Sequence, residues 1–306
     1  MKKSIVFFGS GQISLATINS LIEKFNFEAI ITTPDSRLHG HVVEPAIKTW
    51  AVKNRTPVYQ PTTNNELSKL VAKEKFKSQL GVVAEYGLII PVDVINHFPF
   101  GIVNSHFSLL PSWRGADPIR AGILAGDDKS GVSIIKITPG LDAGDILAQV
   151  EYPLPPDITT PQLTQELIKL NNKLLPKTLN NYLSGQAPLQ PQSNIRQEPT
   201  YAPKISKAAG QIDWAKPAEQ LEREVRAYLG WPGSYTTLAG RQVIITDAHI
   251  ENSQSKPNNF QPGDILTGDN NLVVQAGKGL LRIDRLKPAG KKEITGAEFT
   301  RGYLKH

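Results

Sequence analysis

The 306-residue sequence contains no cysteine and a single methionine, Met1. The absence of cysteine excludes a disulfide framework, a thiolate zinc site and a cysteine nucleophile. Long apolar runs are also missing, because stretches such as 4–8 and 88–91 fall far short of the roughly 18 residues that a membrane span needs. The opening Met1-Lys2-Lys3 leads into an expected strand rather than into the apolar core of a signal peptide. We therefore expect a soluble, cytoplasmic protein without a membrane partner.

The residues that are present suit a folded chain with an anionic partner. Hydrophobic residues make up 40% of the sequence and charged residues 20%, which supplies a sizeable core and argues against disorder. Lys and Arg number 34 against 28 Asp and Glu, a formal net charge of +6. This modest surplus favours an anionic partner but does not identify one.

The N-terminal half alternates short apolar runs with segments of helical period, which is typical of a parallel sheet covered by helices. The expected strands are 4–8, 29–33, 79–84, 101–104 and 132–137. Helices are expected to begin at Asp117-Pro118 and at Thr160-Pro161, and Pro176 is expected to kink or end the second one. The expected fold class is α/β, with a doubly wound and mostly parallel sheet.

A second, smaller domain is expected after a change in composition. Residues 184–203 are rich in Gln, Pro, Ser and Asn, which is typical of an extended linker. We place the first domain at 1–185, the linker at 186–204 and the second domain at 205–306. The second domain is expected to hold one amphipathic helix, 217–229, and the strands 234–238, 242–250, 272–276 and 280–286. Short strands separated by Gly and Asn turns favour a small β-barrel or a β-sandwich.

Three polar side chains of the first domain are the strongest candidates for chemistry. Asn104 and His106 end an expected strand and point to the same side of it, and Asp142 follows in a Gly-rich loop after the next strand. Strand ends line the ligand crevice of an open parallel sheet, so we expect the three to converge. An amide N–H and a protonated imidazole stabilise an oxyanion, as acyl transfer to an amine requires. Taken alone, Asn-x-His also fits a capped strand end, and the loop also fits simple turn chemistry.

The surrounding residues resemble a known signature. The run Asn104-Ser-His-Phe-Ser-Leu-Leu-Pro111 with Arg114-Gly115 and Pro118, together with the loop Gly140-Leu-Asp-Ala-Gly-Asp145, resembles the folate-dependent formyltransferases. Within that superfamily the chain most resembles the enzymes that act on aminoacyl-tRNA. The resemblance extends to 5–9, 84–91, 205–214, 226–233 and 286–292, so that it covers both expected domains.

The resemblance implies that a formyl group is transferred from 10-formyltetrahydrofolate to the α-amino group of methionyl initiator tRNA. By motif position, Asn104, His106 and Asp142 are the implied catalytic residues. The implied fold is a Rossmann-like formyltransferase domain followed by an OB-like barrel, with tRNA held by both. We also expect a monomer that uses no metal. The implied folate contacts are Tyr86, Gly87, Leu88, Ser108, Leu109, Leu110 and Pro111.

A basic strip at the C-terminal end is the expected contact with tRNA. Residues 278–306 hold eight Lys or Arg and three acids, which gives 8 − 3 = +5. Such a strip gives salt-dependent affinity for a phosphate backbone, although a solvated charged face explains it equally well. The expected substrate contacts are Arg37, Arg114, Lys287, Lys291 and Lys292.

Three departures from the family pattern affect the implied site. Phe107 follows His106 where the family usually has a small residue, and Glu85 places a charge in a segment expected to border the pterin pocket. The loop 34–45, which is longer and richer in Lys and Arg in the tRNA enzymes, here keeps only Arg37 among its basic side chains apart from two histidines. We expect this shorter loop to affect the recognition of the acceptor end of tRNA.

The sequence leaves other interpretations open. A formyltransferase acting on a UDP-linked amino sugar shares the same signature, and a nonenzymatic RNA-binding module would need only the barrel. Gly9-Ser-Gly-Gln-Ile-Ser14 imitates a dinucleotide fingerprint, with Asp35 as its ribose partner, but lacks the third glycine. His39 and His41 offer two metal ligands without an evident third.

Overall fold

The computed structural model of the chain describes residues 2–38, 41–251, 260–268 and 271–304. The fold divides into two compact units. The first consists of Met1–Pro118, Ser130–Tyr152 and Gln165–Ala202, and the second of Ile119–Lys129, Pro153–Thr164 and Pro203–His306. No helix in the described residues combines the length and the apolar content that crossing a lipid bilayer requires.

The first unit is built on a seven-stranded sheet in the order β10-β9-β7-β6-β1-β2-β5. Five neighbouring strands, from β7 to β5, run parallel, whereas β9 is antiparallel to β7. The predicted doubly wound, mostly parallel sheet is thereby confirmed. The strands are β1 (Lys3–Phe8), β2 (Phe25–Ile31), β5 (Val58–Tyr59), β6 (Leu80–Val83), β7 (Ile102–His106), β9 (Lys129–Lys136) and β10 (Ile146–Pro153).

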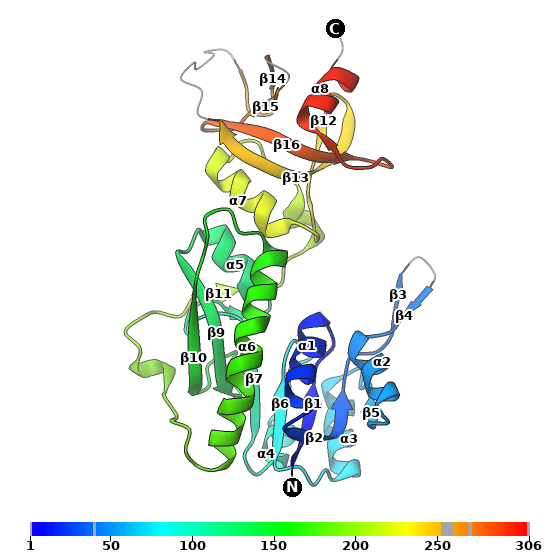
Figure 1. Ribbon diagram of the computed structural model, residues 1–306, viewed down its shortest axis with the longest axis vertical. Helices are drawn as coiled ribbons and strands as arrows, with labels where there is room; N and C mark the ends of the chain where they lie inside the picture. Colours follow the sequence, from blue (N-terminus) through cyan, green and yellow to red (C-terminus); the bar gives the residue numbers. More distant parts are fainter. Residues whose placement is uncertain (1, 39–40, 252–259, 269–270, 305–306) are drawn as a thin grey trace. The chain divides into compact units, whose positions relative to one another are not determined.

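Helices cover both faces of this sheet because its central strands are apolar on both sides (Figure 1). Val6 and Phe8 of β1 pack in one cluster with side chains of α3 and α4. On the other face α1 and α6 lie side by side, where the buried Asn171 donates a hydrogen bond to Thr17 Oγ1 at 3.1 Å. The helices of this unit are α1 (Gln12–Leu21), α2 (Ala46–Lys53), α3 (Asn64–Glu74), α4 (Val92–His97) and most of α6 (Thr160–Leu183), whereas α5 (Pro118–Ala125) belongs almost entirely to the second unit.

The strand order of the first unit reverses between β1 and β6. After β1 the chain adds β2 and β5 on one side, and it then returns to add β6 on the other side of β1. The carboxyl ends of the two strands at such a reversal leave a crevice, which is where open α/β sheets bind ligands. The loops that begin at Gly9 and Ala84 leave the sheet at this point.

Two short pairs complete the first unit. One is a hairpin after β2, formed by β3 (Ser36–Leu38) and β4 (His41–Val43). The other joins β8 (Arg114–Gly115) to β11 (Tyr201–Ala202), which lies in the Gln- and Pro-rich segment.

The second unit contains an antiparallel sheet in the order β12-β13-β16-β15-β14, with β17 paired to β16. Its buried face packs against α7 through Leu221 and Val225 and against α8 through Phe299. The predicted small β domain is confirmed as an antiparallel, half-barrel sheet. Its elements are α7 (Ala218–Tyr228), β12 (Ser234–Leu238), β13 (Arg241–Glu251), β14 (Ile265–Gly268), β15 (Asn271–Gln275), β16 (Leu280–Pro288), β17 (Ile294–Thr295) and α8 (Gly296–Tyr303).

Pro176 does not end the helix that contains it. The helix α6 continues past this residue to Leu183. Proline removes one helical hydrogen bond, but Leu175 and Leu179 on either side of it are fully buried in the first unit. Their packing offsets the loss, because burying a leucine side chain stabilises by about 1.5–3 kcal/mol.

Candidate active site

The structure brings Asn104, His106 and Asp142 together in the first unit, and we refer to them as the trio. Asn104 Nδ2 donates to Asp142 Oδ1 at 3.5 Å, and His106 Nδ1 lies 3.6 Å from Asp142 Oδ2. The side chain of His106 is only 5% exposed, whereas that of Asp142 is 16% exposed. An amide, an imidazole and a carboxylate therefore meet at one place that a substrate can reach through the partly exposed Asn104 and Asp142.

Asp142 reaches the other two residues by a route that the sequence did not predict. Because β9 is antiparallel to β7, its last residue, Lys136, lies beside Val103 rather than beside the end of β7. The loop that follows folds back towards Asn104, and its return is tight, since a Cβ at Gly144 would lie 1.7 Å from the Lys136 carbonyl oxygen. The sequence predicted that the three side chains converge. It was wrong about the cause, because Asp142 does not follow a strand parallel to β7.

Backbone groups hold the trio in place. His106 Nε2 lies 2.8 Å from the carbonyl oxygen of Trp113, and because a carbonyl only accepts, this nitrogen carries the proton and Nδ1 faces Asp142. The N–H of Gly115 donates to Asp142 Oδ2 at 2.8 Å. Gly115 has φ +120°, and a Cβ there would lie 2.6 Å from the Ala202 carbonyl oxygen, so only glycine fits where β8 pairs with β11.

The Ser-Leu-Leu-Pro turn forms a support behind His106. Ser108 Oγ donates to the Ser112 carbonyl at 2.6 Å, and Ser133 Oγ donates to the Ser108 carbonyl at 2.6 Å. The N–H of Leu110 in turn donates to Ser133 Oγ at 3.0 Å. Among the implied folate contacts of this turn, Ser108, Leu110 and Pro111 are buried and Leu109 is half-buried. Phe107 is buried as well, at 5% exposure.

The loop after β6 offers a different surface. The ring of Tyr86 packs edge-on against Phe8, with ring centroids 5.7 Å apart, and its buried hydroxyl has no hydrogen-bond partner within the described residues. Burial raises the pKa of this hydroxyl, which keeps it a neutral donor. Ile89 in the loop after β6 is 78% exposed, and Leu141 in the Asp142 loop is 60% exposed. Each of the two loops therefore presents an apolar side chain to solvent. A ligand that accepts a hydrogen bond would satisfy the Tyr86 hydroxyl, and the exposed side chains suit a ligand with apolar surface.

Glu85 fills the position where a dinucleotide phosphate would bind. Its carboxylate oxygen Oε2 accepts the N–H of Ile13 at 3.1 Å in the first turn of α1. Desolvation raises the pKa of this carboxyl group, and the backbone N–H groups of Ile13 and Ser14 oppose the rise. Asp35, the ribose partner of that alternative, is bound to Lys48 Nζ at 2.6 Å and to Gln60 Nε2 at 2.7 Å. Both carboxylates are thus used inside the protein, which argues against a dinucleotide site.

Gln192 is a residue of the site that sequence reasoning missed. It begins the short 3₁₀ helix Gln192–Asn194 in the Gln- and Pro-rich segment and is 5% exposed. Its amide nitrogen donates to the carbonyls of Asp142 and Gly144, and its amide oxygen accepts two bonds from Arg114. No local signal separates Gln192 from the other glutamines of this segment.

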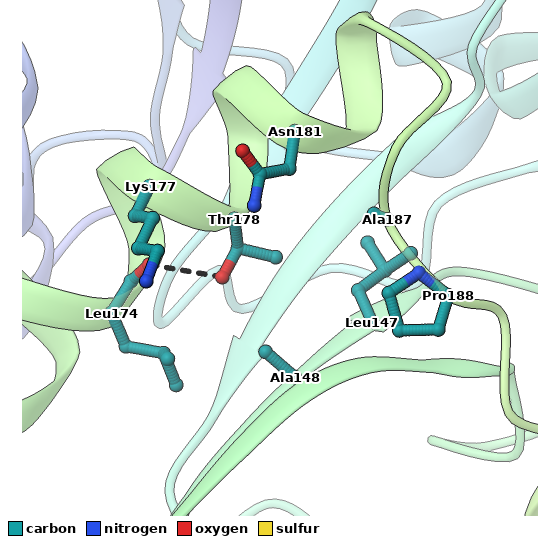
Figure 2. A pocket seen from close by; sticks show the side chains of 8 residues that line it. All are labelled: Leu147, Ala148, Leu174, Lys177, Thr178, Asn181, Ala187 and Pro188. Atoms are coloured by element: carbon teal, nitrogen blue, oxygen red, sulfur yellow. Dashed lines mark hydrogen bonds between the residues drawn. The ribbon is translucent and has the colours of Figure 1, made fainter.

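Among the described residues, two hollows of the first unit are lined by residues other than the trio. The first, of about 180 Å³, lies between α6 and β10 and has an apolar wall with Lys177, Thr178 and Asn181 at its rim (Figure 2). It is smaller than the roughly 300–1,000 Å³ of most ligand pockets, and the hydroxyl of Thr178 is bonded to the Leu174 carbonyl of its own helix. The second, of about 400 Å³, lies between the Asp142 loop and the segment 191–199, with Arg114 and Gln192 in its wall.

Of the expected substrate contacts, Arg114 lies close to the trio in the sequence, whereas Arg37 and the three lysines are far from it along the chain. Arg37 is on the exposed hairpin β3–β4, and the described residues show no contact between it and the trio. Arg114 is adjacent to Gly115, and its guanidinium group is bonded to Gln192. Lys287, Lys291 and Lys292 are exposed at the end of β16 and in the turn to β17 of the second unit. They form no salt bridge among the described residues, unlike Arg285, which pairs with Glu293 at 2.7 Å.

One group in the described part of the chain has the composition of a metal site. Asp247, His249 and Asp284 place ligand atoms within 4.8 Å of one another on the sheet of the second unit. His249 Nδ1 lies 2.5 Å from Asp284 Oδ2, a hydrogen-bond distance, and Arg282 Nε donates to Asp284 Oδ1 at 2.9 Å. A guanidinium group on the same carboxylate opposes a cation, so this group is an ion-pair cluster. His39 of the earlier His39–His41 idea lies outside the described residues.

Comparisons with known proteins agree with this architecture. The Formyl transferase model matches residues 2–179 and the Formyl transferase, C-terminal domain model matches residues 204–304. A methionyl-tRNA formyltransferase of Roseiflexus castenholzii is 36% identical over 307 residues, which covers 99% of this chain and 96% of that protein.

Solved structures share the fold at lower identity. An N-formyltransferase from Helicobacter canadensis, in complex with folinic acid and dTDP-3-aminofucose, has a TM-score of 0.69 at 17% identity and covers 96% of this chain and 100% of its own. HypX from Aquifex aeolicus with tetrahydrofolic acid has a TM-score of 0.65 at 17% identity, over 98% of this chain and 47% of its own. The two domain models and the full-length relative together show that the chain belongs to the methionyl-tRNA formyltransferase family.

Proposed function

We propose that the protein transfers the formyl group of 10-formyltetrahydrofolate to the α-amino group of methionyl initiator tRNA and thereby serves translation initiation. The observation that carries this proposal is the convergence of Asn104, His106 and Asp142 in a chain 36% identical, over nearly its full length, to a methionyl-tRNA formyltransferase. Residues 1–185 are proposed as the catalytic domain and 205–306 as the tRNA-binding domain, joined by 186–204.

The proposed chemistry assigns one task to each side chain. The substrate amine attacks the formyl carbon of the bound donor, the bond from this carbon to N10 of the folate then breaks, and tetrahydrofolate leaves with the proton that the amine has lost. Asn104 donates an amide N–H to the oxyanion that develops, since Nδ2 has a second hydrogen beyond the one directed at Asp142. His106 accepts or donates a proton at Nδ1, because Nε2 is bonded to the Trp113 carbonyl. Asp142 orients this imidazole and stabilises its protonated form.

The attacking amine needs little activation. An α-amino group has a pKa of about 7.7 to 8.0, so a useful fraction is neutral near physiological pH. The proposed reaction therefore uses no protein nucleophile, in keeping with the absence of cysteine. It uses no metal either, and the donor is a cosubstrate rather than a resident cofactor. The folate is proposed to bind at Tyr86, Gly87 and Leu88, where the Tyr86 hydroxyl lacks a partner, and along the turn 108–111.

Transfer RNA is favoured over a nucleotide sugar as the acceptor. The exposed Lys287, Lys291 and Lys292 suit a polyanion longer than a sugar nucleotide, and Arg37 and Arg114 are proposed to contact the acceptor end. The sugar N-formyltransferase noted above shares the fold at only 17% identity. We propose that the protein acts as a monomer in the cytoplasm, where charged tRNA is available.

A direct assay tests this function. The purified protein is incubated with 10-formyltetrahydrofolate and either methionyl initiator tRNA or a UDP-linked amino sugar, and formylated product is measured. We expect formyl-methionyl-tRNA and no formylated sugar. Uncharged initiator tRNA serves as the control, since it has the same phosphates but no α-amino group. Formylation of the sugar alone would overturn the proposal.

A further inference from the structure

The segment that connects the two domains is bonded to the catalytic loops along most of its length. It contributes backbone pairing, side-chain donors and side-chain acceptors to the loops that hold the trio. The contacts are Gln190 to Ile146, Gln192 to Asp142, Gly144 and Arg114, Gln197 to Ser112, Thr200 to Trp113 and Arg114, and Ala202 to Ala116. The segment is therefore part of the wall of the site and not only a spacer.

Gln192 is the centre of these contacts. Its Nε2 donates to the Asp142 carbonyl at 2.7 Å and to the Gly144 carbonyl at 2.9 Å. Its Oε1 accepts from Arg114 Nε at 3.1 Å and Nη2 at 2.7 Å. Carbonyls only accept and a guanidinium group only donates, so the amide has one possible orientation. Both of its hydrogens and both of its lone pairs are used.

The Asp142 loop needs such a restraint. Asp142 has φ 45, a left-handed conformation that costs a non-glycine residue on the order of 1–3 kcal/mol. Its carboxylate must nevertheless stay 3.6 Å from His106 Nδ1 while its backbone turns back towards β9. Gln192 binds the carbonyls on either side of Ala143, so it fixes the backbone from which the carboxylate projects.

We propose that Gln192 is a positioning residue for Asp142, which makes the interdomain segment a functional part of the formyl-transfer site. Gln192 acts through the Asp142 loop and through Arg114, and it does not touch the reacting atoms. The inference rests on the proposed function in so far as Asp142 takes part in formyl transfer. A misplacement of about 1 Å in such a group costs about 100-fold in rate, so the effect is expected in kcat.

Gln192→Met is the main test, because methionine keeps the length of the side chain and removes both donors and the acceptor. We expect kcat for formylation of methionyl-tRNA to fall by about 10- to 100-fold, while KM for tRNA and the Kd of the folate stay within about threefold. Gln190→Met is the matched control, since Gln190 is exposed and contacts Ile146 through its backbone. Gln192→Glu keeps the contact with Arg114 but turns an acceptor towards two carbonyls, so it is expected to lose at least as much rate.

A double-mutant cycle separates positioning from simple stabilisation. In an Asp142→Asn background, Gln192→Met should cost less than about threefold, because the carboxylate that it positions is already gone. Equal costs in both backgrounds, or a Gln192→Met enzyme with wild-type kcat, would overturn the inference. Loss of rate accompanied by an equal loss in folate affinity would do the same.

Hydrogen exchange gives a readout independent of activity. Amides of the peptide 137–145 should exchange faster in Gln192→Met than in the wild type or in Gln190→Met, and unchanged exchange would contradict the restraint. If Gln192→Met does not fold, Gln192→Glu is measured in the same way. A wild-type enzyme that fails to formylate methionyl-tRNA contradicts the proposed function, whereas an active wild type with an unaffected variant contradicts only the role of Gln192.

Discussion

The trio in the first unit and the basic end of β16 in the second are organised in opposite ways. Around the trio, the polar groups are bonded to backbone atoms from distant segments, such as the Trp113 carbonyl and the Gly115 N–H. At the end of β16, Lys287, Lys291 and Lys292 are exposed and free of salt bridges among the described residues. One region is fixed before a substrate arrives, whereas the other presents charge on flexible side chains.

This difference separates rate from affinity. Groups that are fixed in advance stabilise a transition state without reorganisation, so changes there are expected to appear in kcat. Exposed cations bind a phosphate backbone by releasing counterions, so changes there are expected to appear in KM and in its dependence on salt. Substitutions in the two regions therefore test whether the contrast holds.

The largest effect is expected from Asn104→Ala, which removes the proposed oxyanion donor. Loss of one such donor typically costs about 2.7–4 kcal/mol, or about 100- to 1,000-fold in kcat. Folate affinity should change by less than about twofold, because the interaction is made in the transition state. The measurement compares single-turnover formylation with folate binding by calorimetry.

Asn180→Ala provides the control for this experiment, since Asn180 is an exposed asparagine of α6. The control should match the wild type in both measurements. If Asn104→Ala loses folate affinity as much as rate, Asn104 contributes to ground-state binding. The trio region would then affect affinity as well as rate, which contradicts the contrast with the basic end of β16.

Much of the first region could be predicted from the sequence, because its elements have local signals. The apolar runs of β1 and β6 are buried on both faces and are therefore nearly continuous. The helix start at Asp117-Pro118 was confirmed by α5. Asn104 and His106 are two positions apart on one strand, so their spacing alone predicted a shared direction, and the Gly-rich loop supplied Asp142.

Other features had no local signal. The antiparallel direction of β9 depends on tertiary pairing with β7. Gln192 lies 48 and 50 positions from its carbonyl partners and 78 from Arg114, in a segment whose composition indicates only a linker. Short edge strands such as β14 and β17 are too brief for a period to appear. Glu85 was noticed as an unusual charge, but only the structure shows that it caps α1.

An intermediate effect is expected when the three lysines Lys287, Lys291 and Lys292 are replaced together by alanine. Each phosphate contact contributes about one unit of slope to the dependence of affinity on salt. We expect a higher KM for methionyl-tRNA and a salt slope that falls by up to about three, with unchanged folate binding and unchanged kcat at saturation. The readout is KM measured across a series of salt concentrations.

A matched triple variant replaces Lys24, Lys69 and Lys73, three exposed lysines of the first unit, and so changes the net charge equally. If both variants flatten the slope to the same extent, the effect is one of net charge, and the basic end of β16 is not a specific contact. An unchanged slope in the first variant argues against phosphate binding there altogether.

The smallest effect is expected on stability, when the ion pair between His249 and Asp284 on the sheet of the second unit is removed. The hydrogen bond that His249 donates to Asp284 raises the pKa of His249, Asp247 adds to the rise, and burial and Arg282 oppose it. A raised pKa means that the folded state holds the proton more tightly, so the stabilisation is present below the ordinary value of 6.5 and is lost as pH rises through the raised value. The His249 side chain is 57% exposed, so solvent screening keeps the contribution below about 1 kcal/mol.

His249→Asn should therefore lower the urea midpoint below pH 6.5 and leave it unchanged well above the raised pKa of His249. His41→Asn, which replaces another exposed histidine in the first unit, should have no comparable effect. A large loss of stability at every pH would mean that His249 is a fixed structural element, and the second unit would then resemble the trio region in its organisation. A small loss confined to low pH supports the view that the charged groups of the second unit adjust to what surrounds them, as the proposed contact with a polyanion requires.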